Sequence, residues 1–192
     1  MKRANATGSE PKLADSVRAS ARARLRDLIA SERNRARLHI GMIRRSEPNA
    51  SRDRVANVIL ERLIRAASLE GGLTGALGFL GVPLNLVAFA YLEIALVVAV
   101  AEAYDVPLEG PAGEDALLGV LGKAHGVEDV LRSTPRVLGA IAKTLALRHG
   151  FLTLGRLVPL VASPIAARLN QRAMDRTATE ALRRFGNVVR IA

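Results

Sequence analysis

Apolar residues recur every three or four positions through the first part of the chain. Between residues 13 and 45 the main apolar positions are Leu13, Val17, Leu25, Leu28 and Ile29. Arginines occupy much of the other side, so this spacing predicts an amphipathic helix over 13–45. Pro48 marks a turn, and Ser51 is a suitable N-cap for a second helix over about 52–69.

A long apolar run over 71–104 departs from this amphipathic pattern. Between Gly71 and Val100 the single formal charge is Glu93. The first third of the run contains five glycines, mostly three or four residues apart: Gly71, Gly72, Gly75, Gly78 and Gly81. Glycines at this spacing share a helix face and allow another backbone or a membrane surface to approach closely. We expect a short helix or a loop over 71–82, and after Pro83 a nearly all-apolar helix over 84–103.

The second half of the chain alternates turn signals with shorter helical segments. Residues 105–114 contain two prolines and two glycines and predict a loop. Helices are expected over 114–124, 135–148 and 164–185, the last with Ser163 as N-cap. No segment has the pattern of a strand. The sequence therefore predicts an all-α, compact domain of about six to eight helices. It is divided into a disordered lead-in (1–12), a basic N-terminal helical region (13–54) and a main helical domain (55–192).

The apolar run is long enough to be weighed as a membrane span. Residues 73–92 carry no charge, but Pro83 and the glycines lie inside that window. A window over 84–103 places Glu93 near its centre, where a carboxylate costs at least ~2.5 kcal/mol. Flanking aromatic belts are absent from the sequence. A buried central helix or a membrane-contacting hairpin is the favoured interpretation, and an integral membrane component of a transporter is an alternative.

Charge is distributed unevenly along the chain. Residues 1–54 carry a net charge of +8, residues 55–149 carry −3, and residues 150–192 carry +5. Basic ends attract polyanions, either anionic lipid headgroups or nucleic-acid phosphates. The alternative is that the arginines merely solvate helix surfaces. The first 20 residues lack the apolar core of a signal peptide, so we expect a cytoplasmic protein, peripheral at the inner face of the membrane.

Two segments together resemble the EcsC family of bacterial proteins. The first is Gly71-Gly72-Leu73-Thr74-Gly75-Ala76-Leu77-Gly78-Phe79 with Pro83, continuing to Ile94, Ala95 and the Ala103-Tyr104 pair. The second is Pro159-Leu160-Val161-Ala162-Ser163-Pro164-Ile165-Ala166-Ala167-Arg168-Leu169-Asn170, followed by Ala178 and Phe185. Alanine stands at Ala162 and Ala166, where glycine is common in the family. The resemblance covers about 55–186 and implies a helical protein accessory to a transport or secretion system, with a protein partner in that system.

Catalytic chemistry has few candidates in this sequence. The three histidines, His39, His125 and His149, lie far apart and share no motif with acidic residues. No HExxH pattern or phosphate-binding loop occurs, and the chain has no cysteine. We therefore expect a protein that is not an enzyme and needs neither a cofactor nor a metal.

The other candidate functional residues suggest contact surfaces for lipid or a protein partner. Gly71, Gly72, Gly75, Gly78 and Glu93 are the candidate lipid- or partner-contacting residues. We expect Glu93 to be buried, either paired structurally with an arginine or a backbone amide or acting as a ligand-contacting carboxylate of raised pKa. A basic surface is predicted on the last helix: Arg168, Arg172, Arg176 and Arg183.

These features predict a non-catalytic, membrane-associated or lipid-interacting helical protein with anionic membrane or lipid as its partner. A basic helical module that binds nucleic acid is the less favoured alternative, because no aromatic interleaving or recognition motif is present.

Overall fold

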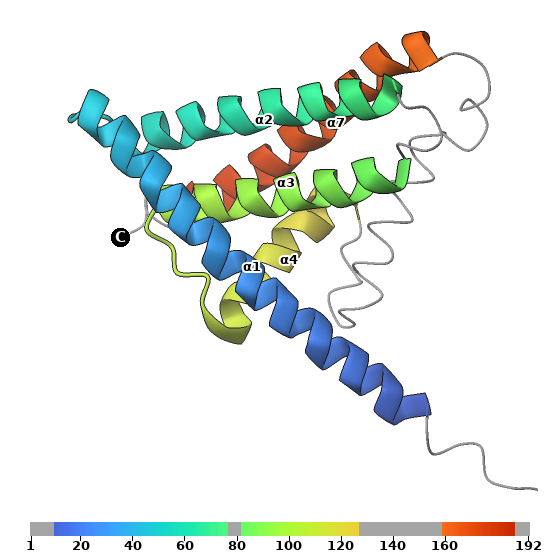
Figure 1. Cartoon of the computed structure of the whole chain (residues 1–192). Helices are drawn as coiled ribbons and strands as arrows, with labels where there is room; N and C mark the ends of the chain where they lie inside the picture. Colours follow the sequence, from blue (N-terminus) through green and yellow to red (C-terminus); the bar gives the residue numbers. More distant parts are fainter. Residues whose placement is uncertain (1–9, 77–81, 127–158, 187–192) are drawn as a thin grey trace, which may run out of the picture.

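The computed structural model describes residues 10–76, 82–126 and 159–186. These residues form five α-helices and a final π-helical turn, without any strand, so the all-α prediction is confirmed for this part of the chain (Figure 1). The helices are α1 (Glu10–Ser46), α2 (Arg52–Ala76), α3 (Val82–Ala103), α4 (Gly110–Ala124) and α7 (Pro159–Ala181), with the π turn η3 (Leu182–Gly186) at the end of α7. The predicted helix over 135–148 lies outside the described residues.

Helix α3 lies at the centre of the fold. Every residue over 93–101 is buried, which explains why this helix is apolar on all sides. Helix α3 begins at Val82, so Pro83 stands in its first turn as predicted. It ends with Asp105 in the left-handed conformation (φ 57°), while the Val106 N–H bonds to the Ala101 carbonyl and the Asp105 N–H to the Glu102 carbonyl. These two bonds form a Schellman motif, which turns the chain sharply toward α4.

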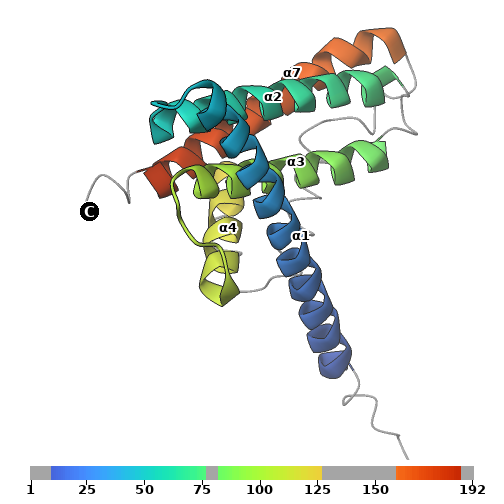
Figure 2. The ribbon, with the colours of Figure 1, turned by 60° about the vertical axis from the view of Figure 1, so that its left-hand side comes forward.

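Helices α1 and α7 lie on opposite sides of α3 (Figures 1 and 2). Tyr91 of α3 bonds to Glu32 of α1, whereas Glu93 bonds to Thr177 of α7. Two residues along an α-helix differ in direction by about 200°, so these contacts leave α3 on opposite sides. Helix α2 packs beside α3 and α7, and the N-terminal part of α1 projects beyond the other described helices (Figures 1 and 2).

The first two helices follow the sequence prediction closely. Helix α1 contributes one stripe to the core: Leu25, Ile29, Ala36, Ile40 and Ile43. After the turn at 47–50, the Ser51 hydroxyl accepts a hydrogen bond from the Arg54 N–H at 3.1 Å, as expected of an N-cap. The start of α2 is also buried on one side, with Val55 and Ile59 in the same core as the α1 residues.

Three helix boundaries differ from the prediction. Helix α2 runs on to Ala76, so Gly71, Gly72 and Gly75 are helical. Helix α4 starts at Gly110 rather than 114, because Pro111 in the first turn favours helix once Glu109 is extended (φ −79°, ψ 148°). Helix α7 starts at Pro159 rather than 164, so Ser163 is not its N-cap and Pro164 lies inside it. Proline at 159 occupies a first helical position equally well, and the sequence did not discriminate between the two prolines.

Candidate functional site

A buried polar cluster joins three helices at the centre of the molecule. The Glu93 side chain is 1% exposed, and the Thr177 hydroxyl of α7 donates a hydrogen bond to its Oε1 at 2.7 Å. His125 Nε2 lies 2.9 Å from both carboxylate oxygens. An ionised carboxylate only accepts hydrogen bonds, so a proton on Nε2 would make this contact a donated hydrogen bond. The cluster therefore ties α3, the end of α4 and α7 together through a single carboxylate.

The backbone at the end of α4 places the histidine. His125 is the C-cap of the helix, and its N–H bonds to the Leu121 carbonyl. Gly126 follows with φ +68°, a left-handed conformation that suits glycine, and its N–H bonds to the Lys123 carbonyl. This cap ends α4 with the imidazole directed at Glu93. Sequence reasoning did not find this contact, because His125 shares no local motif with an acidic residue and Glu93 lies 32 positions away.

The burial predicted for Glu93 is confirmed, but its partners are not those predicted. A histidine and a threonine hold the carboxylate, where an arginine or a backbone amide was expected. Because the Glu93 carboxylate is enclosed on all sides, an outside ligand reaches it only if the helices separate. This arrangement fits the structural role for Glu93 better than the ligand-contacting role.

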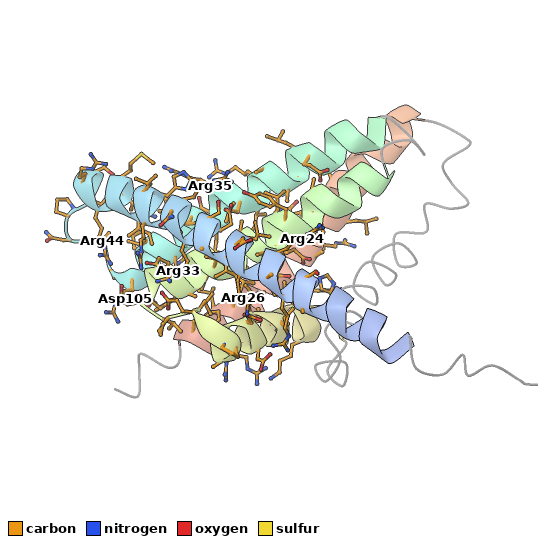
Figure 3. All side chains as sticks on the ribbon, turned by 60° about the horizontal axis from the view of Figure 1, so that its bottom comes forward. Arg24, Arg26, Arg33, Arg35, Arg44 and Asp105 are labelled. Carbon is orange, nitrogen blue, oxygen red and sulfur yellow. The ribbon has the colours of Figure 1, made fainter. Side chains whose placement is uncertain are left out.

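Several arginines of the basic N-terminal region pair with acidic residues of the middle of the chain. Arg33 Nε lies 3.0 Å from Glu102 Oε2, and Arg37 also donates to Glu102. Figure 3 shows Arg26 and Arg33 along the edge of α1 that faces α4, and Arg24 and Arg35 along the opposite edge. Part of the N-terminal positive charge is thus balanced inside the fold.

Helix α4 receives the second set of these ion pairs. Glu114 is 1% exposed, and its two oxygens lie 3.6 Å from Arg22 and 3.5 Å from Arg26. Asp115 lies 3.6 Å from the same Arg22 guanidinium. Arginines of α1 therefore form ion pairs with both α4 and α3, and these pairs help to orient α1 relative to the two helices.

The Arg33–Glu102–Arg37 cluster has a measurable pH signature. Burial raises the pKa of the Glu102 carboxyl, but the hydrogen bonds from Arg37 and Arg33, together with their charges, outweigh it and lower the pKa below its usual 4.5. A lowered folded-state pKa stabilises the fold above the unfolded-state pKa, and this contribution is lost as pH falls through the folded-state pKa.

Replacing Glu102 with glutamine should therefore lower the free energy of unfolding at neutral pH by about 1.5–3 kcal/mol. It should also make stability less dependent on pH below about 4.5. Urea unfolding at several pH values measures both effects. The exposed Glu61–Arg65 pair supplies the control, since Glu61→Gln should change little. Equal pH profiles for wild type and Glu102→Gln would contradict the prediction.

The predicted basic surface on α7 is exposed. Arg168, Arg172, Arg176 and Arg183, which we call the α7 arginine face, are all exposed. At 100° per residue, Arg168, Arg172 and Arg176 fall within an arc of about 80°, opposite the buried stripe that contains Met174, Thr177 and Ala181, and Arg183 follows in η3. Three members have no ion-pair partner among the described residues, and Arg183 lies 4.0 Å from Glu180.

The glycine candidates are only partly within the described residues. Gly71, Gly72 and Gly75 lie in the last two turns of α2, which packs along α7. Gly78 lies outside the described residues. Near this end of α2, the buried Asn170 of α7 donates its Nδ2 hydrogens to the Ala67 carbonyl at 3.3 Å and to Glu70 Oε2 at 3.1 Å. Asn170 therefore links α7 to α2 by hydrogen bonds.

The described residues can be assessed for metal binding and for membrane spanning. They contain no group of three or more His, Asp or Glu side chains placed to hold a metal ion. None of the described helices combines the length and apolar character needed to cross a bilayer.

Comparison of this chain with known proteins found no match. No family model matches it, and neither a curated protein nor a solved structure is significantly similar. The resemblance to the EcsC family therefore stays a prediction that rests on the two sequence segments alone.

Proposed function

We propose that this chain is a non-catalytic helical protein that binds the surface of an anionic membrane through the α7 arginine face. The observation that carries the proposal is the placement of three exposed arginines on the side of α7 opposite its core contacts, with the exposed Arg183 following in η3. Each basic residue close to an anionic bilayer contributes about 1 kcal/mol of attraction. Arginine also forms bidentate hydrogen bonds with phosphate, which suits it to lipid headgroups.

Nearby charges modify this face without reversing its sign. At 100° per residue, Asp175 lies about 20° beyond one edge of the arginine arc and Glu180 about 40° beyond the other, so part of the positive charge is offset. Lys123, exposed at the end of α4, lines a shallow depression together with Arg176 and adds a further positive charge. Together with Lys123, the four arginines outnumber the two nearby acidic residues, so the α7 arginine face keeps a net positive charge. The proposed location is the cytoplasmic face of a membrane, with an accessory role in transport or secretion as the resemblance implies.

Neutralising three members of this face should weaken membrane binding strongly. Replacing Arg168, Arg172 and Arg176 with glutamine should reduce binding to phosphatidylserine-containing vesicles by about tenfold or more. Co-sedimentation measures this, and raised salt should weaken wild-type binding in the same way. The matched control removes three exposed charges from α2: Arg54, Arg62 and Arg65 to glutamine.

Two results would overturn the proposed function. One is equal binding of the α7 variant and wild type to anionic vesicles, and the other is equal binding of wild type to neutral and anionic vesicles. RNA that displaces the protein from vesicles in direct competition would favour the nucleic-acid alternative instead.

A further inference from the structure

A second exposed surface lies on α1 and combines apolar with basic side chains. Leu38 is 67% exposed and Met42 is 47% exposed, although both are large apolar residues. They lie four residues apart and therefore adjoin on the helix surface, with Arg35 before them and Arg45 after them. We call these four residues the α1 outer patch.

The α1 outer patch carries no negative charge of its own. The positions three and four residues from its two apolar members hold no acidic side chain: Asn34, Arg35, His39, Gly41, Arg45 and Ser46. Arg35 reaches sideways to Glu32 and Tyr91, and Arg45 Nε donates to the Gly41 carbonyl at 3.2 Å. The Arg35 guanidinium is therefore turned toward α3 and paired with Glu32, although the Arg35 side chain is still 61% exposed, whereas that of Arg45 stays on α1; the two arginines stand on either side of the apolar pair. A short apolar contact flanked by arginines is the composition of a helix that lies in a lipid interface.

This patch faces away from the α7 arginine face. The buried stripe of α1 contacts α3, so the α1 outer patch points away from the core on that side. Helix α7 packs on the other side of α3 (Figure 2), and the exposed arginines of the α7 arginine face lie opposite its core contacts. One flat bilayer therefore contacts one of these two surfaces at a time.

We propose that the α1 outer patch binds a second anionic bilayer by inserting Leu38 and Met42, so that one molecule bridges two membranes. Bridging requires membrane binding by the α7 arginine face and so rests on the proposed function. Membrane binding by the α1 outer patch is argued independently, from the exposed side chains of that patch. Attraction by Arg35 and Arg45 brings the bilayer close, and burial of the two apolar side chains adds a contribution that salt does not screen. The charge complementarity of the patch selects an anionic lipid surface as its occupant.

Vesicle clustering separates bridging from binding. Wild type should make phosphatidylserine-containing vesicles aggregate, seen as a rise in turbidity. The double variant Leu38→Gln, Met42→Gln keeps good helix formers at exposed positions, and it should weaken the α1 contact about 10- to 100-fold. It should lose clustering but still co-sediment through α7. The α7 triple glutamine variant should also lose clustering, while residual binding through α1 remains. Leu69→Gln is the matched control, since Leu69 is 70% exposed on α2.

A fluorescent reporter tests the α1 contact directly. The chain has no cysteine, so Leu38→Cys provides a single labelling site for a polarity-sensitive dye. Addition of anionic vesicles should shift its emission to the blue, and the shift should persist in the α7 triple variant. The same dye at Leu69→Cys should not respond. An unchanged spectrum at position 38, with normal vesicle binding through α7, would overturn the inference and leave the proposed function intact.

Clustering by a protein dimer would also overturn the inference. Analytical ultracentrifugation without lipid tests this outcome, because self-association through the α1 outer patch would give a wild-type dimer and a monomeric double variant. A monomeric wild type that clusters vesicles supports bridging by one molecule. If RNA shifts the dye at position 38 and vesicles do not, the patch binds nucleic acid and the inference fails.

Discussion

Replacing His125 with alanine should lower the free energy of unfolding by about 3–5 kcal/mol, one of the largest effects expected in this chain. The Glu93 carboxylate is fully enclosed and accepts hydrogen bonds from His125 and Thr177. Without the His125 imidazole, the buried Glu93 carboxylate is left with the Thr177 hydroxyl alone of these two hydrogen-bond partners. His39 provides the matched control, since it is exposed on α1 and His39→Ala should change stability little. Urea or guanidinium unfolding measures both variants.

The companion changes at Glu93 separate charge from packing. Glu93→Gln keeps the size of the side chain and accepts from Thr177, whereas Glu93→Leu leaves two buried donors unpaired at a cost of about 1–3 kcal/mol. The double variant Glu93→Leu, His125→Leu removes both partners and should recover much of the loss. If His125→Ala is as stable as His39→Ala, the central cluster does not stabilise the fold.

Gly113→Ala should destabilise the protein by about 3 kcal/mol, because the new methyl group has no space. A Cβ at Gly113 would lie 2.2 Å from the carbonyl carbon and 2.3 Å from the carbonyl oxygen of Leu108. These are backbone atoms just before α4, so they move only if the start of the helix moves. Gly119 lies on the same helix, and a Cβ there meets nothing within 4 Å. Gly119→Ala should therefore stabilise the protein by about 0.5–1 kcal/mol through helix propensity.

The two alanine variants test one helix with opposite expected signs. Thermal or urea unfolding of both, with circular dichroism to check helicity, is sufficient. Equal shifts in the same direction would mean that α4 does not pack its first turn against Leu108.

The helices were predictable because their patterns are local. Apolar spacing placed α1 and α3 within a few residues of their observed bounds, and Ser51 was found as an N-cap from its position alone. The helix boundaries that were predicted wrongly are those where two sequence patterns were equally compatible with a helix start or end. Pro159 and Pro164 both suit a first turn, and glycines at 71–75 are compatible with a helix or a loop until α7 packs beside them.

The partners of Glu93 were not predictable in the same way. Burial of the carboxylate followed from its apolar neighbours, but its partners come from residues 32 and 84 positions away. One signal was present: a buried carboxylate needs donors, and Thr177 lies on the core stripe of α7, as Asn170 does. The ion pairs of the α1 arginines also had a sequence signal, the net negative charge of residues 55–149. Charge totals alone do not show which arginines form these pairs.

The ion pairs of α1 have a consequence for synthesis of the chain. Arg33 and its partner Glu102 are separated by 69 residues. At about 5–20 residues per second, a ribosome needs roughly 3–14 s to make that segment. During this interval the arginines of α1 and its apolar stripe have left the ribosome ahead of α3 and α4, the helices that will cover them. The newly made helix is then a free basic amphipathic segment, whose encounters with membrane or chaperone precede folding.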